Sequence, residues 1–336
     1  MKSYFLTLAS RVRLGEPLPL LWDVLLRVLT PVTRMGMAHR LRQTAVTVDA
    51  HVVSFGNITT GGTGKTPAVI ERVKAELAQG KRVAVITRGY GSERVKEPFV
   101  VPPALELATV ARQVGDEPAL IRLHAPECTL IKAAKRVDGA RVAVSELGCD
   151  VIVLDDAYQH VALARDENHC LIDASNPFAS GHLVPRGILR EPLEALRRAT
   201  HIHLTRCDQA QDLEGLRAQI AALVPHLTVR ESYHAPGRFW YVQNGEEVEA
   251  TVLEEIRNVG VTAVSAIGNP EAFSRTLQNM GIRVGLAWCC PDHAPIDREA
   301  LERPGYIVTT EKDAMRIVDP PANLIALEIV LKDWND

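Results

Sequence analysis

Short apolar segments alternate with helix-like segments from residue 51 to about residue 230. Residues 51–55 are typical of a buried strand, 66–79 of a helix that ends at Gly80, and 82–86 of a second strand. Further short apolar runs continue the pattern at residues 128–131, 151–154, 170–172 and 201–204. Because strands that alternate with helices form βαβ units, the pattern predicts an α/β fold: a parallel sheet flanked by helices.

The pattern changes after residue 230. Residues 238–250 contain an Asn-Gly pair between two candidate strands, which favours a type I′ turn and predicts a β-hairpin. Three candidate strands of a smaller α/β unit follow, at residues 262–267, 283–287 and 305–308. We therefore expect an N-terminal segment (1–45), a larger α/β domain (46–230) and a smaller C-terminal α/β domain (231–336), with 238–250 as a hairpin linker.

The N-terminal segment has a pattern of its own. Leucines and a valine recur at three- or four-residue spacing, which predicts an amphipathic helix, at Leu18, Leu21, Leu25, Leu29 and Val32. The first 42 residues also carry seven Lys and Arg side chains against two acidic ones. Such a helix either packs on the core or lies in the headgroup region of an anionic membrane. No segment reaches the roughly 18 uninterrupted apolar residues that a membrane span needs.

A phosphate-binding loop is indicated by the segment FGNITTGGTGKTP at 55–67. It follows a predicted strand and opens a predicted helix, so backbone N–H groups and the helix N-terminus would face an anion. The GxxxxGK[ST] pattern has threonine in place of its first glycine, and three later glycines supply the flexibility. We expect nucleoside triphosphate binding by Thr59, Thr60, Gly61, Gly62, Thr63, Gly64, Lys65 and Thr66. Lys65 would reach the β- and γ-phosphates, and the Thr66 hydroxyl would contact Mg²⁺.

Acidic residues that could manage the metal follow the apolar run VIVL. A phosphate-loop fold commonly places such a group at the end of a buried strand, and Asp155 and Asp156 stand there. Either aspartate alone would also be typical of a turn or a helix cap. The pair, with His160 close behind, favours a metal site, and Glu191 in LREP is a second acidic candidate.

Two polar clusters lie outside these motifs. GDEP places Asp116 in a loop before a helix, and PDH places His293 in a loop far along the chain. A loop aspartate is commonly a helix cap, and a loop histidine is commonly just exposed. A kinase acting on an alcohol, however, needs a carboxylate or an imidazole to take the hydroxyl proton, and these residues could provide it.

The segment LTRCD at 204–208 is a weaker signal. It is faintly similar to the guanine-reading [NT]KxD motif, with Arg206 in the lysine position. Solvated charges at the end of a strand explain it better.

Composition narrows the classes of partner. The 336 residues include 38 basic and 41 acidic side chains, so no overall basic field favours nucleic acid. The six cysteines are scattered without a CxxC pair, which fits reduced thiols in the cytosol. An apolar content of 46% is enough to fill a sizeable core in each expected domain.

Taken together, the motifs resemble those of the tetraacyldisaccharide 4′-kinases, the lipid A 4′-kinases of Gram-negative envelope synthesis. They occur in that family's order and approximate spacing: GNITTGGTGKTP (56–67), TRGYG (87–91), GDEP (115–118), DDAYQH (155–160), LREP (189–192), IGNP (267–270), PDH (291–293) and TTEKDA (309–314). The resemblance extends to about residue 318. Alanine at 157, cysteine at 290 and threonine at 87 depart from the family pattern beside the functional side chains, which leaves details of the substrate pocket open.

The resemblance implies transfer of the γ-phosphate of ATP to the 4′-hydroxyl of a tetraacylated, 1-phosphorylated glucosamine disaccharide. It also implies ATP and Mg²⁺ as cofactors, a peripheral location at the cytoplasmic face of the bacterial inner membrane, and no obligate protein partner. Since an acylated substrate resides in a bilayer, the basic amphipathic segment is then better explained as interfacial than as part of the core.

The resemblance also assigns roles to residues. Asp116 would be the catalytic base with His293 as its dyad partner, while Asp155, Asp156 and Glu191 would form the acidic group at the metal. His160 would lie near the nucleotide or the metal, and Arg88 and Arg190 would be weaker candidates for phosphate contacts. Because Asp116 and His293 lie in different expected domains, we expect closure of a cleft around the substrates.

Two other functions compete with this interpretation. A partitioning or regulatory ATPase would have a similar loop, but its characteristic second lysine would fall at Thr60, and the clusters at Asp116 and His293 would stay unexplained. A soluble small-molecule kinase would leave the amphipathic segment with only a packing role.

Overall fold

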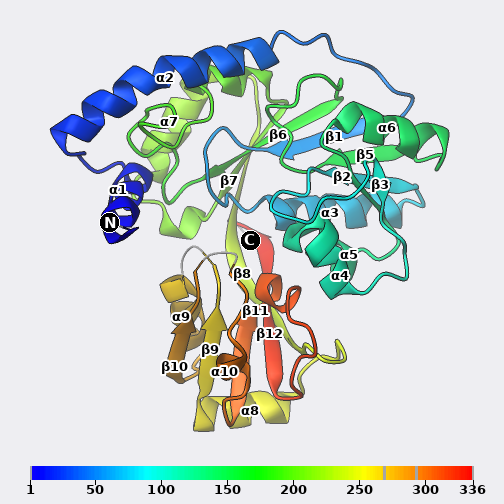
Figure 1. Ribbon diagram of the computed structural model, residues 1–336, viewed down its shortest axis with the longest axis vertical. Coiled ribbons are helices and arrows are strands. Elements are labelled where there is room, and N and C mark those ends of the chain that lie inside the picture. The colour runs from blue at the N-terminus through cyan, green and yellow to red at the C-terminus, as the bar shows by residue number, and fades with distance from the viewer. Residues whose placement is uncertain (1, 268–269, 292–293, 335–336) are drawn as a thin grey trace.

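The computed structural model describes residues 2–267, 270–291 and 294–334, and these residues form two lobes (Figure 1). The strands of the larger lobe are β1 (His51–Gly56), β2 (Val83–Thr87), β3 (Phe99–Val100), β4 (Thr129–Lys132), β5 (Val151–Leu154), β6 (Glu167–Asp173) and β7 (His201–Thr205). The smaller lobe is built on β9 (Val261–Ser265), β10 (Val284–Cys289), β11 (Tyr306–Thr310) and β12 (Leu324–Asp333). The long strand β8 (Val229–Tyr241) runs from one lobe to the other.

All of these strands belong to one continuous sheet with the order β10-β9-β11-β12-β8-β7-β6-β1-β5-β2-β4-β3. Within the larger lobe β1 pairs in parallel with both β5 and β6, and β3 is antiparallel to β4. The central strands are apolar on both faces: five of the six residues of β1 and all four of β5 are buried. This is the composition that a parallel sheet covered on both faces requires.

Helices cover both faces of the larger sheet. One face packs against α3 (Lys65–Ala78), α4 (Leu107–Val114) and α5 (Asp116–His124), and the other against α6 (Arg136–Ser145). At the β6–β7 end the sheet packs against α7 (Leu213–Leu223) and the 3₁₀ helix η1 (Leu193–Arg198), and the short 3₁₀ helix η2 (Cys207–Gln209) follows β7. The smaller lobe carries α8 (Ala250–Val259), α9 (Pro270–Asn279), α10 (Arg298–Leu301) and α11 (Glu311–Ala314). The predicted α/β fold with a parallel sheet flanked by helices is confirmed.

The connection between the lobes differs from the simple hairpin that residues 238–250 predict. The chain does turn there, with Gly245 at a φ of 76° and Tyr241 N donating to Glu246 O at 2.9 Å. The returning strand, however, is reduced to a single bridge between Trp240 and Glu247. The lobes are instead joined by β8 and β12, which pair antiparallel along most of β12.

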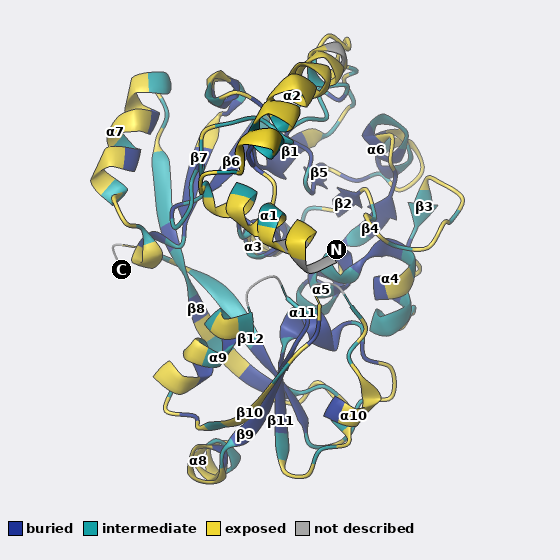
Figure 2. Cartoon of the chain, turned by 60° about the vertical axis from the view of Figure 1, so that its left-hand side comes forward, coloured by how far each residue is buried: buried dark blue, intermediate teal, exposed yellow. Residues whose placement is uncertain are grey.

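Two N-terminal helices, α1 (Lys2–Leu14) and α2 (Leu20–Arg40), lie across the larger lobe. Trp22 of α2 donates from Nε1 to the Tyr4 hydroxyl of α1 at 3.0 Å, so the two helices contact one another. Arg186 and Asp23 form an ion pair at 2.7 Å that ties α2 to the body of the protein. Figure 2 shows that most of α2 is nevertheless exposed. Within the described residues, every helix is too short or too polar to cross a membrane.

Candidate phosphate-transfer site

The loop between β1 and α3 has the backbone shape of a phosphate cradle. Gly61 and Gly64 have φ values of 106° and 77°, which lie in the left-handed region that favours glycine. A side chain at position 64 would also collide with a neighbour, because a Cβ atom there would lie 2.6 Å from His234 Nε2. Helix α3 starts at Lys65, so its first N–H groups point toward the loop.

The loop is held from two sides by other segments. Thr205 Oγ1 donates to Thr63 O at 3.0 Å, and Arg206 Nη1 donates to Gly62 O at 2.9 Å. On the other side, Thr60 N donates to Ile188 O and Arg190 N donates to Ile58 O, each at 2.7 Å. The interpretation of segment 204–208 as solvated strand-end charge is therefore wrong for Arg206, which supports the loop and pairs with Asp173.

Lys65 lies inside this arrangement with only 9% of its surface exposed. Its Nζ is 3.3 Å from Asn57 Oδ1 and 3.5 Å from Asp156 Oδ1. Asn57 in turn donates to Thr59 O at 2.9 Å, which fixes the start of the loop. The ammonium group of Lys65 thus lies between the loop and the carboxylate of Asp156.

The two adjacent aspartates after β5 occupy contrasting environments. Burial, and then the negative charges of Glu117 and Asp156, raise the pKa of Asp155 to about 7. Burial also acts to raise the pKa of Asp156, but the charges of Lys65 and Arg190 outweigh it and hold that pKa below its usual value. Two neighbouring carboxyls with pKa values driven apart are typical of catalytic sites.

The residues here fit a magnesium ion. Asp155 Oδ1 is buried and has no hydrogen-bond partner among the described residues, while Oδ2 accepts a long 3.5 Å bond from Thr87. The Thr66 hydroxyl belongs to the first turn of α3 at the same loop. Carboxylate and hydroxyl oxygens are the hard ligands that Mg²⁺ prefers, and a cation would favour the ionised form of Asp155.

Glu191 lies behind these aspartates and is fully buried. Arg198 Nη2 donates to its two carboxylate oxygens at 2.8 and 2.7 Å, and Gln159 Nε2 donates to Oε1 at 2.9 Å. The preceding residue reaches the site directly, because Arg190 Nη1 lies 3.2 Å from Asp156 Oδ2. The structure therefore brings Arg190 into contact with the acidic pair. The Glu191 carboxylate instead accepts hydrogen bonds from Arg198 and Gln159.

His160 and Arg88 lie on the other flank of the site. Burial, and then the charges of Arg136, Arg165 and Arg88, lower the pKa of His160 to about 4, so its ring is neutral near pH 7. Its Nε2 is buried without a hydrogen-bond partner among the described residues. Arg88 is exposed just beyond the carboxyl end of β2.

Asp116 is the first residue of α5, at the side of the site that faces the smaller lobe. Its Oδ1 accepts from Glu117 N at 3.1 Å, and its Oδ2 lies 3.8 Å from Lys312 Nζ and 4.0 Å from Arg316 Nε. Since the charge of Glu117 acts on Asp155, the start of α5 is near the acidic pair. His293, the predicted dyad partner, lies outside the described residues.

A glycine-rich loop, a buried lysine and an acidic pair at the carboxyl ends of parallel strands define a phosphate-loop nucleotide-binding protein. The family model of tetraacyldisaccharide-1-P 4′-kinase matches residues 17–333. The chain belongs to this family, which confirms the resemblance of its motifs.

Individual relatives agree with this assignment. The tetraacyldisaccharide 4′-kinase of Anaeromyxobacter dehalogenans (strain 2CP-C) is 43% identical over 82% of this chain and 74% of its own. That of Geobacter sulfurreducens is 33% identical over 95% of this chain and 90% of its own. Among solved structures, LpxK from Aquifex aeolicus in complex with ATP superimposes with a TM-score of 0.70 at 26% identity, covering 99% of this chain and 95% of that one.

Several residues of the site were not predicted from the sequence. Asn57, Gln159 and Lys312 stand inside recognised motifs, so their position was a usable signal, but nothing local showed what each side chain contacts. Arg206 stands in the segment 204–208, but its partners Gly62 and Asp173 are distant in the sequence. Arg316 lies outside the recognised motifs, and its partner Asp116 is distant as well.

Proposed function

We propose that this chain is a tetraacyldisaccharide 4′-kinase, which transfers the γ-phosphate of ATP to the 4′-hydroxyl of tetraacyldisaccharide 1-phosphate in lipid A biosynthesis. The observation that carries the proposal is the placement of buried Lys65 between a glycine-rich loop and two aspartates with unequal pKa values. Membership of the kinase family over residues 17–333 supplies the substrate.

The larger lobe binds the nucleotide in this proposal. Backbone N–H groups of the loop 59–66 and the N-terminus of α3 surround the phosphates of ATP. Lys65 extends to the β- and γ-phosphates and offsets the charge that develops as the bond to ADP breaks. Thr205 and Arg206 keep the loop in shape, since both donate hydrogen bonds to its carbonyl groups.

The acceptor alcohol loses its proton as its oxygen bonds to phosphorus, and we assign that proton to Asp116. Asp116 suits this role because it stands at the start of α5, close to the acidic pair and beside the smaller lobe. His293 would orient its carboxylate.

We assign Thr66, Asp155 and Asp156 to hold Mg²⁺. When bound, the ion would neutralise charge on the β- and γ-phosphates. Gln159 and Arg198 hold Glu191 in place, and Glu191 supports the acidic pair through Gln159 and Arg190. His160, neutral near pH 7, and Arg88 would complete the flank that faces the nucleotide.

A phosphate-transfer assay that compares the wild type with Asp116→Asn tests the proposed kinase activity and the role of Asp116. The protein would be incubated with ATP, Mg²⁺ and tetraacyldisaccharide 1-phosphate in detergent, and mass spectrometry would look for one added phosphate. We expect product from the wild type and from Asp208→Asn, an exposed control, and largely none from Asp116→Asn. ATP hydrolysis without product, undiminished in Asp116→Asn, would return the chain to the regulatory ATPases.

The N-terminal helices fit peripheral binding to an anionic membrane. An apolar stripe on α2 faces solvent rather than the core, formed by Leu21, Val24, Val28, Val32 and Met35. Leu21 is 79% exposed and Val28 is 68% exposed, which is far more than a core-packing helix would leave. Helix α2 also carries Arg27 and Arg34, and α1 carries Arg11 and Arg13 in its last turn. We therefore place the protein at the cytoplasmic face of the inner membrane, where its lipid substrate resides.

Vesicle sedimentation tests this placement. Val28→Asp should weaken binding to vesicles that contain anionic phospholipid, because a charge would enter the apolar stripe. The matched control is Val259→Asp, since Val259 is exposed on the smaller lobe, away from α2. Equal partitioning of the two variants and the wild type would contradict the interfacial role.

We also propose that the two lobes act as domains, over residues 46–230 and 231–336, that close around ATP and the acceptor. Closure would exclude water and limit hydrolysis of ATP. X-ray scattering should show a more compact particle with a non-hydrolysable ATP analogue and acceptor, and identical profiles would argue against closure.

A further inference from the structure

The motif TTEKDA at 309–314 contributes none of the residues that we assign to nucleotide binding, metal binding or proton transfer. In the structure it covers the end of β11 and the short helix α11. Helix α11 belongs to the smaller lobe but lies against α5 of the larger lobe (Figure 2). Asp116 is the first residue of that neighbouring helix, so α11 is placed to act on it.

The start of α11 is fixed to the far end of α5. Glu311 Oε2 lies 2.9 Å from His124 Nε2, and Glu311 Oε1 accepts from Trp240 Nε1 at 2.9 Å. The side chains of His124 and Glu311 are each only 6% exposed. His124 Nδ1 is also 3.6 Å from Glu328 Oε1 on β12. This buried cluster anchors the last residue of α5 to the smaller lobe.

The other contact is at the near end of α5. Lys312 Nζ lies 3.8 Å from Asp116 Oδ2 and 3.3 Å from Glu117 Oε1. Arg316 Nε approaches the same Asp116 oxygen at 4.0 Å. Because α11 contacts both ends of a nine-residue helix, it sets the direction of α5 as well as its position.

Arg316 also connects Asp116 to two loops of the smaller lobe. It pairs with Asp313, and its Nη2 donates to Ala266 O at 3.4 Å while Nη1 donates to Ala294 O at 3.2 Å. Ala266 follows β9, and Ala294 stands in the loop after β10. Asp313 Oδ2 reinforces the first link by accepting from Ala266 N at 2.9 Å. One guanidinium therefore joins the Asp116 carboxylate to both loops.

We propose that Lys312 and Arg316 are positioning residues, which hold the Asp116 carboxylate for the acceptor hydroxyl and couple it to the smaller lobe. The inference rests on the proposed function, in which Asp116 takes the hydroxyl proton. The two cations face one oxygen of Asp116 from the side of the smaller lobe, at 3.8 and 4.0 Å, while Glu117 N donates to the other. Neither cation contacts the phosphate loop in the part of the chain that the structure describes.

Kinetics of Lys312→Ala and Arg316→Ala, with ATP affinity measured separately, test the proposal. Because displacement of a reacting group by about 1 Å costs up to about 100-fold in rate, we expect kcat to fall by about 10- to 100-fold. The Kd for ATP should stay within about twofold of the wild type, since the loop that binds it is formed by the larger lobe. Lys312→Arg should recover most of the rate, because it restores a cation at the same place.

The matched control is Arg298→Ala, which removes a cation of the smaller lobe whose side chain is 89% exposed. It should match the wild type in rate and in thermal midpoint. If Arg316→Ala does not fold, Arg316→Lys replaces it: the shorter, single-centre cation cannot make all the contacts of the guanidinium, so kcat should still fall.

Unchanged kcat in Lys312→Ala and in the Arg316 variant, or a parallel loss of ATP affinity and rate, would overturn the positioning role. A wild type that binds ATP but does not phosphorylate the acceptor would instead overturn the proposed function, so the two failures are distinguishable.

Discussion

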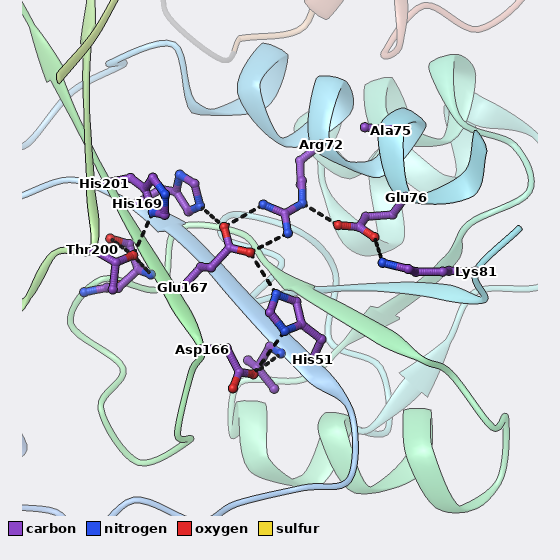
Figure 3. Close-up of polar contacts among 12 residues, drawn as sticks. His51, Arg72, Ala75, Glu76, Lys81, Asp166, Glu167, His169, Thr200 and His201 are labelled. Atoms are coloured by element: carbon purple, nitrogen blue, oxygen red, sulfur yellow. Dashed lines mark hydrogen bonds and ion pairs between the residues drawn. The ribbon is translucent and has the colours of Figure 1, made fainter. Parts of the chain in front are cut away.

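Charged side chains at the two ends of the parallel strands in the larger lobe have opposite environments. We call the carboxyl ends of these strands the carboxyl edge of the sheet and their amino ends the amino edge. At the carboxyl edge, Asp155 is buried with one oxygen that has no described partner, and its pKa is raised to about 7. At the amino edge, Glu167 accepts from Arg72 at 2.7 and 2.6 Å, and His51 Nε2 and His169 Nε2 lie 2.8 and 2.9 Å from it (Figure 3). The hydrogen bonds of Arg72 are the largest cause that lowers the pKa of Glu167.

The paired network at the amino edge extends across the fold. Arg72 also donates to Glu76 at 2.7 Å, and Lys81 donates to Glu76 at 2.7 Å (Figure 3). His169 Nδ1 lies 2.9 Å from His203 Nε2 on β7. The network thus connects β1, β6 and β7 to α3, and its carboxylates are saturated by donors.

We interpret the paired charges at the amino edge as structural and the incompletely paired carboxylates at the carboxyl edge as functional. Removal of a carboxylate whose oxygens are both engaged by cations costs stability, because it leaves those cations unpaired. A buried carboxylate that is left under-satisfied costs stability and persists where a ligand completes it. Variants at the two edges should therefore fail in different ways.

The largest effect is expected at the carboxyl edge. Lys65→Met should lower kcat by about 10²- to 10³-fold, because it removes a donor aimed at charge that develops during transfer. Unfolding in urea should change little, since Asp156 keeps its contact with Arg190. The matched control is Lys74→Met, an exposed lysine of the same helix that should match the wild type in both measurements. A large loss of stability in Lys65→Met would contradict the assignment.

The reverse outcome is expected for Glu167→Gln. Removal of this charge should cost about 2 kcal/mol of unfolding free energy, at the low end for a broken ion pair because the side chain is partly exposed. Activity per folded molecule should be unchanged. Glu214→Gln serves as the control, because its side chain is well exposed and it pairs with Arg217 on the same helix turn. If Glu167→Gln instead lowers kcat at full stability, the amino edge has a chemical role.

Asp155→Asn should lose activity and gain stability at neutral and higher pH. The folded pKa of about 7 lies above the value of about 3.8 that an aspartate has in the unfolded chain, so Asp155 favours folding most at low pH and loses that contribution as pH rises toward 7. At pH 8 the variant should be about 1 to 2 kcal/mol more stable than the wild type and almost inactive. Urea unfolding at pH 5 and pH 8 measures the difference, which should shrink at pH 5. A variant that is less stable at pH 8 would show that Asp155 is structurally paired.

The effect that is smallest at neutral pH concerns the histidines of the amino edge. Burial is the main cause that lowers the pKa of His169 to about 4 and that of His203 to about 3. Because the unfolded chain protonates near 6.5, stability should fall as pH drops from 6.5 toward 4, by at most about 1.4 kcal/mol per pH unit for each histidine. The slope of unfolding free energy against pH should be shallower in His203→Gln. Equal slopes would mean that His203 is already protonated or exposed.

The carboxyl edge was largely predictable because its signals are local. The loop 59–66 follows a strand and opens a helix, and Asp155 and Asp156 end an apolar run, so neighbouring residues alone identify them. The hydrogen-bond partners and the pKa shifts of these carboxylates were not predictable. Nothing near Glu191 in the sequence shows that Arg198 and Gln159 engage it, and the unequal pKa values of the aspartate pair arise from burial and from Glu117, Lys65 and Arg190.

The amino edge and the link between the lobes escaped prediction because their partners are far apart. The Glu167 network joins residues from four separate elements. Strand β8 contains Pro236 and Gly237, which weaken a strand pattern, and it is stabilised by β12 about 90 residues later. Long-range pairing of this kind leaves little trace in periodicity.

Hydrogen exchange with and without ATP and Mg²⁺ tests the central contrast most directly. At labelling times short enough to sample only local opening, the account predicts slower exchange in residues 59–66 when nucleotide binds. Exchange at the amino edge, in residues 167–169 and 201–203, should be unchanged. Protection centred on the amino edge, or a loop at 59–66 that ATP leaves unprotected, would contradict the division between a chemical and a structural edge.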